Sequence, residues 1–148
     1  MAEHERTAAW INSVLKQLSL LEHEKGITIL QECGRECTAA SALLEGAFKV
    51  GNVSRNADPE ELFRIFKQQY YNTPNLSKTG SVITLVFEEC TCPMYRKGVT
   101  NPYLCSCTTG FSRHIFETLF GRPVTVTLLG SILKGDDVCK QEIVIEDE

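Results

Sequence analysis

Six of the seven cysteines in this 148-residue chain lie in close pairs, and thiols are suited to soft-metal binding and to nucleophilic or redox chemistry. The cysteines are Cys33 and Cys37, Cys90 and Cys92, Cys105 and Cys107, and the single Cys139. Their odd number argues against a disulfide framework, because the first residues lack the basic start and apolar block of a secretion signal. We therefore expect reduced thiols that bind a metal or take part in chemistry.

The four loop cysteines are the first candidates for a metal site. Cys90 and Cys92 follow a predicted strand, and Cys105 and Cys107 lie at or just before the start of a predicted helix. The partial positive charge at a helix N-terminus should lower the pKa of such thiols, and four thiolates can close a tetrahedral zinc site. The C-x-C spacing differs from the C-x2-C pattern of common zinc ribbons, so ordinary reduced cysteines beside a helix end stay an alternative.

The other three cysteines are secondary metal candidates. Cys33 and Cys37 are one helical turn apart, so they either face the same internal site as the loop pairs or are small buried residues at a helix interface. An iron–sulfur cluster would need spacings that this chain does not have. Cys139 alternates in phase with Ile143 and Ile145, which predicts a core position.

His114 is the candidate catalytic base, because it lies two turns beyond Cys107 on the same predicted helix and a Cys–His pair can form an activated nucleophile. A structural or exposed histidine is the alternative. Glu88 and Glu89 precede the Cys90 loop and could ligate a metal or act as a base, although exposed acids at a strand end are the ordinary case.

The residue pattern predicts that the first half of the chain, residues 1–75, is mainly helical. One apolar stripe is expected on a first helix that ends or bends at Gly26, formed by Trp10, Ile11, Val14, Leu15, Leu18 and Leu21. A second helix is expected from Ile27 to Lys49, with one face formed by Cys33, Cys37, Ala40, Leu44 and Phe48. A third helix should begin at an Asp58 cap followed by Pro59 and end before Pro74.

Residues 80–146 are rich in cysteine, and their pattern predicts both strands and a helix. After a loop at 72–80, residues 81–87 predict a central strand, and a helix should run from Pro102 or Thr109 to Phe120 with Gly121 ending it. Residues 123–132 and 138–145 predict an antiparallel hairpin. We therefore expect a single α+β domain over residues 1–148. Its N-terminal helices would pack on an antiparallel sheet, with a strand–helix–strand–strand unit at the C-terminal end.

Composition excludes several classes of protein. Hydrophobic residues make up 43% and charged residues 23%, which is typical of a globular domain, and no apolar run approaches the ~20 residues of a membrane span. The net charge of −4 and the lack of a Lys/Arg cluster argue against nucleic-acid binding. We expect a cytoplasmic protein with neither a membrane nor a nucleic acid as partner.

The last third of the chain carries the most specific pattern. A helix ending in Phe120-Gly121-Arg122-Pro123-Val124 leads into a strand, then into Gly135-Asp136-Asp137-Val138-Cys139 and a final strand. This pattern resembles the 4-vinyl-reductase domain, whose fold is shared by the Bet-type subunits of the TRAPP tethering complex. The segment from Cys92-Pro93 to Cys107 also looks like the aminothiazoline-carboxylate hydrolase-like group. The resemblance covers about residues 80–146.

The resemblance implies a ligand pocket between helices and sheet, with a zinc ion beside it. Among the ligands that it implies are Cys139 and a cysteine near Cys105 or Cys107. Two further ligands, a Glu and a Cys, correspond to Leu128 and Ser131, which are not strong zinc ligands. The implied site is therefore altered in this chain, and the two alternatives are that Cys90 and Cys92 replace the missing ligands or that the metal is absent.

Several functions stay open on the sequence. The leading hypothesis is a small-molecule-binding domain with a cysteine-lined zinc site and an apolar or thiol-related ligand. The second is a cysteine- or metal-dependent hydrolase of a small C–N ring compound, as the resemblance implies. The third is a helical dimerisation or interaction domain, which would form a homodimer, and thiol redox sensing is a fourth. Elemental analysis with a free-thiol count separates the zinc hypothesis from the others.

Overall fold

A computed structural model describes residues 2–38, 41–54, 56–90 and 92–147 and confirms the α+β class. The α-helices are α1 (Glu3–Ser19), α2 (His23–Cys37), α3 (Ala42–Val53), α4 (Pro59–Tyr70), α5 (Pro93–Arg96) and α6 (Cys105–Phe120). Two short 3-10 helices are η2 (Pro102–Leu104) and η3 (Ile132–Lys134). The strands are β1 (Leu76–Thr79), β2 (Val82–Phe87), β3 (Val124–Gly130) and β4 (Cys139–Ile145).

The four strands form one antiparallel sheet in the order β1-β2-β4-β3. The predicted central position of β2 and the predicted hairpin of β3 and β4 are therefore confirmed. The prediction of a plain loop over 72–80 was wrong, because this segment contains β1. Gly80 adopts a φ of 60°, which favours glycine, and this turn folds β1 back onto β2.

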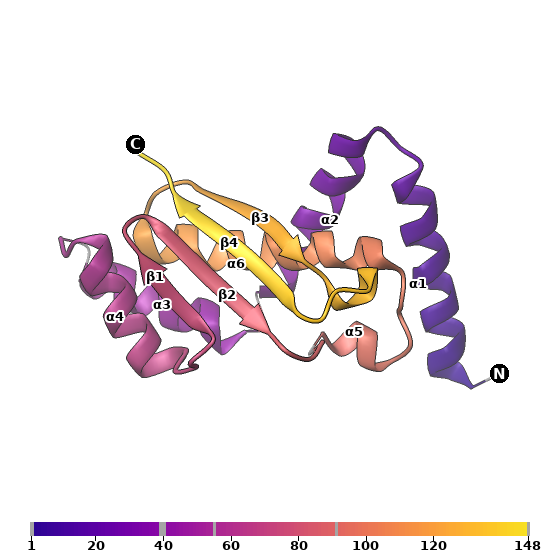
Figure 1. Ribbon diagram of the computed structural model, residues 1–148, viewed down its shortest axis with the longest axis horizontal. Helices are drawn as coiled ribbons and strands as arrows, with labels where there is room; N and C mark the ends of the chain where they lie inside the picture. The colour runs from indigo at the N-terminus through magenta and orange to yellow at the C-terminus, as the bar shows by residue number, and fades with distance from the viewer. Residues whose placement is uncertain (1, 39–40, 55, 91, 148) are drawn as a thin grey trace.

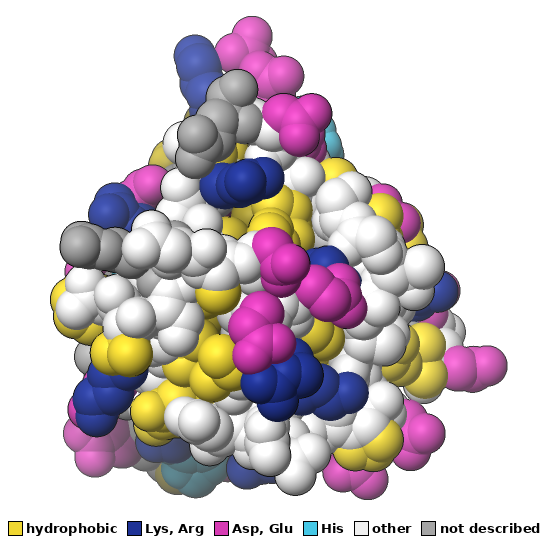
Figure 2. All heavy atoms as spheres, turned by 90° about the vertical axis from the view of Figure 1, so that its left-hand side faces the viewer, with side chains coloured by type: hydrophobic (Ala, Val, Ile, Leu, Met, Phe, Trp, Pro, Cys, Tyr) yellow, Lys and Arg dark blue, Asp and Glu magenta, His cyan; other side chains and the backbone are white. Residues whose placement is uncertain are grey.

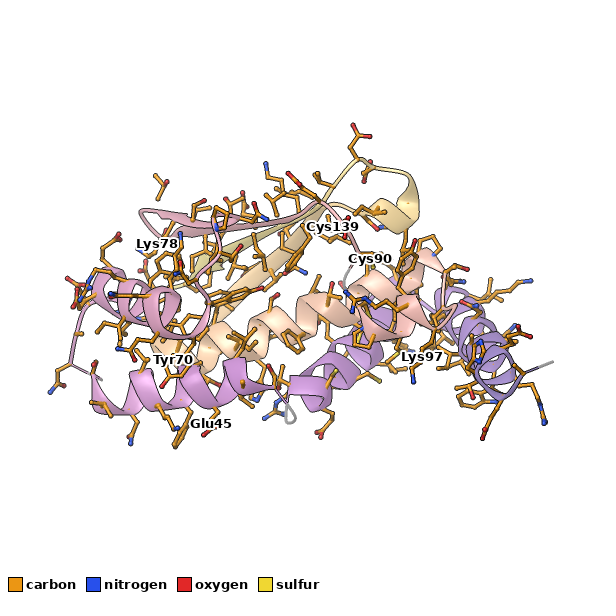
Figure 3. The ribbon with its side chains drawn as sticks, turned by 90° about the horizontal axis from the view of Figure 1, so that it is seen from below. Glu45, Tyr70, Lys78, Cys90, Lys97 and Cys139 are labelled. Atoms are coloured by element: carbon orange, nitrogen blue, oxygen red, sulfur yellow. The ribbon has the colours of Figure 1, made fainter. Side chains whose placement is uncertain are left out.

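Helix α6 lies between the sheet and the helices α2 and α3, as Figures 1 and 3 show. Alternate residues of the strands point toward α6, since successive side chains of a strand face opposite sides. They form the main core with side chains of α4 and α6, and its fully buried members include Phe66, Leu76, Ile83, Ile115, Phe116, Leu119 and Ile143. This core occupies the space between the helices and the sheet.

Glycines allow α2 to approach the backbone of α6 closely. A Cβ atom added to Gly34 would overlap the carbonyl oxygen of Cys107 and lie 2.8 Å from the Phe111 nitrogen. One added to Gly110, on α6, would lie 2.5 Å from the Gln31 Cα atom. Real Cβ atoms essentially never come this close to backbone atoms. The two helices therefore cross at a point where only glycine fits on each side.

The predicted helix from Ile27 to Lys49 is in fact two helices, α2 and α3. Ser41 begins α3, because its Oγ atom accepts a hydrogen bond from the Leu43 N–H at 3.1 Å. Gly26 does not end the first helix but lies buried within α2, where it faces Tyr103. Periodicity missed the break, since both helices are apolar on one side and no proline separates them. Ala40, predicted on the shared face, lies outside the described residues.

The predicted faces of the N-terminal helices were partly wrong. Leu15 is buried as expected, but Trp10 is 69% exposed and Phe48 is 61% exposed. Helix α1 contacts α2, η2 and the segment before η2, where Asn12 hydrogen-bonds to Gly98, and the buried residues of α1 are Ala8 and Leu15, so a narrow strip of the helix is covered. That strip belongs to a second, smaller core around Ala8, Leu15, Leu30, Val99 and Leu104.

The predicted boundary signals for α4 and α6 are confirmed. Asp58 accepts a hydrogen bond from the Glu61 N–H at 2.9 Å at the start of α4. Gly121 ends α6 in the left-handed conformation, with a φ of 64°. Both signals are local, and this is why they could be read from the sequence.

Within the described ranges, no helix is both long enough and apolar enough to cross a membrane.

Replacing Gly34 with alanine should destabilise the domain by about 2–4 kcal/mol, because the new methyl group overlaps the Cys107 backbone and α2 must move away from α6. Urea unfolding measures the change. The exposed Glu36 on the same helix provides the control, since Glu36→Ala should change stability by less than about 0.5 kcal/mol. Equal stability of the Gly34→Ala variant and the wild type would contradict the close helix crossing.

Candidate functional site

Three cysteines from distant parts of the chain meet at one end of the sheet. Phe87, the last residue of β2, pairs with Cys139, the first residue of β4. Cys90 lies three residues after Phe87 in the chain. Figure 3 shows Cys90 and Cys139 side by side at this end, above the first turns of α6. Cys105, the first residue of α6, completes the group, since it hydrogen-bonds to Ser131, and the next residue, Ile132, hydrogen-bonds to Cys139. We call Cys90, Cys105 and Cys139 the sheet-end thiols.

Ser131 and Ile132 hydrogen-bond two of the sheet-end thiols, Cys105 and Cys139. The Ser131 Oγ atom lies 3.0 Å from the Cys105 Sγ atom in a buried hydrogen bond. The next residue, Ile132, donates its N–H to the Cys139 Sγ atom at 3.4 Å. Cys105 and Ser131 are 6% and 1% exposed, whereas Cys90 and Cys139 are half-buried. The group therefore has a closed inner side and a partly open outer side.

The loop between β3 and β4 positions Ser131. Asp136 accepts a hydrogen bond from the Ser131 N–H at 2.8 Å through its Oδ2 atom, and its own N–H donates to the Ser131 carbonyl at 3.0 Å. Gly135 adopts a φ of 101°, which allows the chain to turn so that Asp136 lies against Ser131. The Gly-Asp-x-x-Cys pattern thus has a physical role. Asp136 escaped prediction as a site residue because its partner is a backbone N–H, which a sequence pattern does not reveal.

A buried polar network sets the register of α6 against β4. The Ser112 hydroxyl donates to the Gln141 Oε1 atom at 2.5 Å, and the Gln141 Nε2 atom donates to the Thr108 hydroxyl at 3.1 Å. Gln141 follows Cys139 by two residues and Thr108 follows Cys105 by one turn, so the network aligns the two cysteines. Buried amides without partners are costly, which makes this register specific.

Burial raises the pKa of two of the sheet-end thiols, Cys105 and Cys90. Desolvation raises the pKa of Cys105 more than the hydrogen bond from Ser131 lowers it, and the neighbouring Cys139 and Cys90 add smaller increases. Desolvation also raises the pKa of Cys90. The prediction that the helix N-terminus lowers the pKa of Cys105 and Cys107 was therefore wrong. The 3-10 helix η2 precedes Cys105 directly, so the free N–H groups lie earlier, where Asn101 caps Tyr103.

The remaining cysteines form a second group around Cys107. Cys107 is 9% exposed, and desolvation raises its pKa to about 12, with further increases from Cys33, Cys37 and Cys92. Cys33 and Cys37 are exposed on α2, so the prediction that they are buried interface residues was wrong. Cys92 acts on both Cys90 and Cys107 and lies between the two groups. The structure thus divides the predicted four-cysteine set, and Cys139 takes the place beside Cys90 and Cys105.

The zinc site implied by the resemblance is not formed by its own four positions. Leu128 has an apolar side chain, and Ser131 supplies a hydroxyl that is already hydrogen-bonded to Cys105. In the part of the chain that the structure describes, no three Cys, His, Asp or Glu side chains are placed so that they could hold a metal ion. A metal would therefore require the thiols to rotate from their present hydrogen bonds.

The structure does not bring the other candidate residues to the thiols. His114 is half-buried on α6, and no hydrogen bond among the described residues joins it to a cysteine. Glu88 and Glu89 are exposed beyond the end of β2. The arrangement offers sulfur ligands at the sheet end, but it does not offer a preformed nucleophile–base pair among the described residues.

The surface hollows lie away from the sheet-end thiols. A hollow of about 450 Å³ is lined by α4 at the opposite end of the molecule, where Figure 2 shows acidic and basic side chains mixed with apolar ones. Another of about 390 Å³ lies between α1 and the segment from Met94 to Val99. No described cysteine lines either hollow.

Comparison with known protein families gives one match. The model of a family of unknown function, DUF6144, matches residues 1–148. The chain belongs to this family. No curated protein matches the chain. The matched range contains both thiol groups.

Alkylation should distinguish the exposed thiols from the buried ones. Cys33 and Cys37 are exposed, whereas Cys105 and Cys107 are buried and have raised pKa values, so iodoacetamide should modify the first pair at least about tenfold faster at neutral pH. Peptide mass spectrometry over a time course measures the rates, and urea-unfolded protein serves as the control in which they converge. Faster modification of Cys105 in the folded protein would contradict the burial of that thiol.

Cys107 should make the domain less stable in alkali. Folding raises the pKa of Cys107 from 9.0 to about 12. Its contribution to the free energy of unfolding is therefore complete below pH 9 and is lost as the pH rises toward 12. The free energy of unfolding should therefore fall by up to about 1.4 kcal/mol per pH unit in this window. Urea unfolding at several pH values measures the slope. The conservative variant Cys107→Ser should lose this part of the slope, whereas Cys37→Ser should keep it, and identical slopes would contradict the raised pKa.

Proposed function

We propose that this domain binds zinc through the sheet-end thiols Cys90, Cys105 and Cys139. The observation that carries the proposal is that these three thiols come from three separate segments and gather beside one serine, Ser131. Thiolates are preferred zinc ligands, and three protein ligands with an open fourth position are typical of zinc sites that bind a further molecule. The function proposed is a small-molecule-binding domain with a cysteine-lined zinc site.

Zinc binding requires two small rearrangements. Cys105 must rotate away from the Ser131 hydroxyl, and Cys139 must give up the hydrogen bond from the Ile132 N–H. Each change breaks a hydrogen bond to sulfur, which is a weak hydrogen-bond partner. The raised pKa of Cys105 means that zinc must displace a proton, so affinity should increase with pH.

The half-buried sulfurs of Cys90 and Cys139 form the outer side of the proposed site. A small ligand would approach from this side, because the Cys105 side is closed by Ser131 and the core. When bound to three thiolates, zinc accepts a fourth ligand such as a thiol or a carboxylate. A thiol-containing small molecule therefore suits the chemistry of the site.

Replacing any one of the three thiols should weaken zinc binding by at least about tenfold, since each supplies one of only three ligands. The variants are Cys90→Ser, Cys105→Ser and Cys139→Ser, and competition with a chromophoric chelator measures the affinity. The double variant Cys33→Ser/Cys37→Ser is the matched control, because it removes two exposed thiols outside the group and should retain wild-type affinity. Circular dichroism confirms that each variant folds.

A gain of affinity would test the geometry most directly. Ser131→Cys places a fourth thiol beside Cys105, so zinc affinity should increase by about tenfold or more, whereas Ser131→Ala should leave three ligands and nearly unchanged affinity.

Zinc affinity that is the same in the Cys90, Cys105 and Cys139 variants as in the wild type would overturn the proposal. So would wild-type protein that binds no zinc at micromolar concentrations in either the purified or the titrated form.

A further inference from the structure

The point where α2 crosses α6 lies between two exposed cysteines. Gly34 touches the backbone of Cys107, and the neighbouring turn of α2 carries Cys33 immediately before Gly34 and Cys37 one turn after Cys33. Consecutive Cα atoms are about 3.8 Å apart, so Cys33 lies next to the contact itself. Figures 1 and 3 show α2 alongside the first half of α6 at this place.

These three thiols have complementary properties. Cys33 and Cys37 are open to solvent, whereas Cys107 is buried at the helix contact. Because Gly34 touches the Cys107 backbone, both exposed thiols lie within one helical turn of the contact with Cys107. An exposed thiol can meet a soluble oxidant, and a nearby buried thiol can then close a disulfide that water does not reach easily.

We propose that Cys33, Cys37 and Cys107 form a site of reversible oxidation by peroxides, in which a disulfide joins Cys107 on α6 to Cys33 or Cys37 on α2. This proposal does not rest on the zinc site, since it uses none of the sheet-end thiols. The result of oxidation is a covalent link between the two helices at the point where their backbones touch.

The chemistry balances with hydrogen peroxide as the oxidant. The sulfur of Cys33 or Cys37 attacks one peroxide oxygen, the O–O bond breaks, and the leaving hydroxide takes the thiol proton to form water, which leaves a sulfenic acid. The Cys107 sulfur then attacks the sulfenic sulfur, the S–O bond breaks, and hydroxide leaves with the Cys107 proton as a second water molecule. Two thiols are oxidised to one disulfide and one peroxide is reduced to two waters.

Helix geometry favours the link between helices over a link within α2. Residues four apart on a helix have Cβ atoms about 5–6 Å apart, whereas a disulfide needs about 3.5–4.5 Å. A Cys33–Cys37 disulfide would therefore distort α2. Cys107 belongs to a separate helix, so a link to it does not require either helix to unwind.

Tryptic mapping of the full chain tests the proposal, because trypsin cleaves after lysine and arginine. Cys33 falls in the peptide 26–35 and Cys37 in the peptide 36–49, since Arg35 separates them, whereas Cys107 falls in the peptide 98–113. The reduced, metal-free protein is treated with hydrogen peroxide, remaining thiols are alkylated, and the digest is analysed without reductant. Fragmentation between Cys105 and Cys107 identifies which of these two carries the link.

The expected product is peptide 98–113 joined through Cys107 to peptide 26–35 or 36–49, and dithiothreitol should reverse it. Cys107→Ser should reduce this product at least tenfold, while the matched variant Cys139→Ser, which changes a sheet-end thiol, should retain it. A link through Cys105, a link only between peptides 26–35 and 36–49, or free Cys107 after the exposed thiols are oxidised would each overturn the proposal. The fragmentation data on the wild type decide the matter even if Cys107→Ser fails to fold.

Discussion

The backbone contact between α2 and α6 is the constraint on which the rest of the structure depends. Gly34 and Gly110 have no side chains, so the two helices meet more closely than residues with a Cβ atom allow. Gly51 of α3 makes a similar approach, because an added Cβ atom there would lie 2.8 Å from the Leu119 carbonyl oxygen. With α2 and α3 fixed on one side, α6 presents its opposite side to the sheet. The position of Cys105, its first residue, follows from this arrangement.

The sheet-end thiols show how burial outweighs a local electrostatic effect. A helix N-terminus stabilises a thiolate by about 1 kcal/mol, whereas burial in an apolar setting can shift a pKa by several units. Because η2 already occupies the N-terminal end before Cys105, the favourable partial charge is further weakened and desolvation decides the direction. The same balance explains why Ser131 and Cys105 are hydrogen-bonded as neutral groups.

The two thiol groups lie close together but differ in their surroundings. The sheet-end thiols are held by the β3–β4 loop and the end of β2, and their inner side is closed by Ser131. The Cys107 group instead spans a contact between two helices and includes thiols on the surface. The first group is the one proposed to bind zinc, and the second, with exposed thiols beside a buried one, is the one proposed to undergo oxidation. Cys92, which lies between the groups, interacts with both.

Local signals in the sequence determined much of the fold. The Asp58 cap, the helix end at Gly121, the β3–β4 hairpin and the α+β class all depend on neighbouring residues, so composition and spacing were sufficient to predict them. The cysteine pairs also marked the part of the chain where both thiol groups lie. The role of the sulfurs could not be predicted as well from the sequence, because their burial and partners depend on contacts with distant segments.

Tertiary structure alone decided how the cysteines are grouped. Spacing placed Cys105 with Cys107, yet on a helix two residues apart they point in directions about 200° apart, and each joins a different set of partners. The exposure of Cys33 and Cys37 follows from Gly34, rather than either cysteine, occupying the contact with α6. The sequence determined which residues could do chemistry, and the packing of α6 between the helices and the sheet decided which of them meet, because that packing depends on backbone contacts between segments far apart in the sequence.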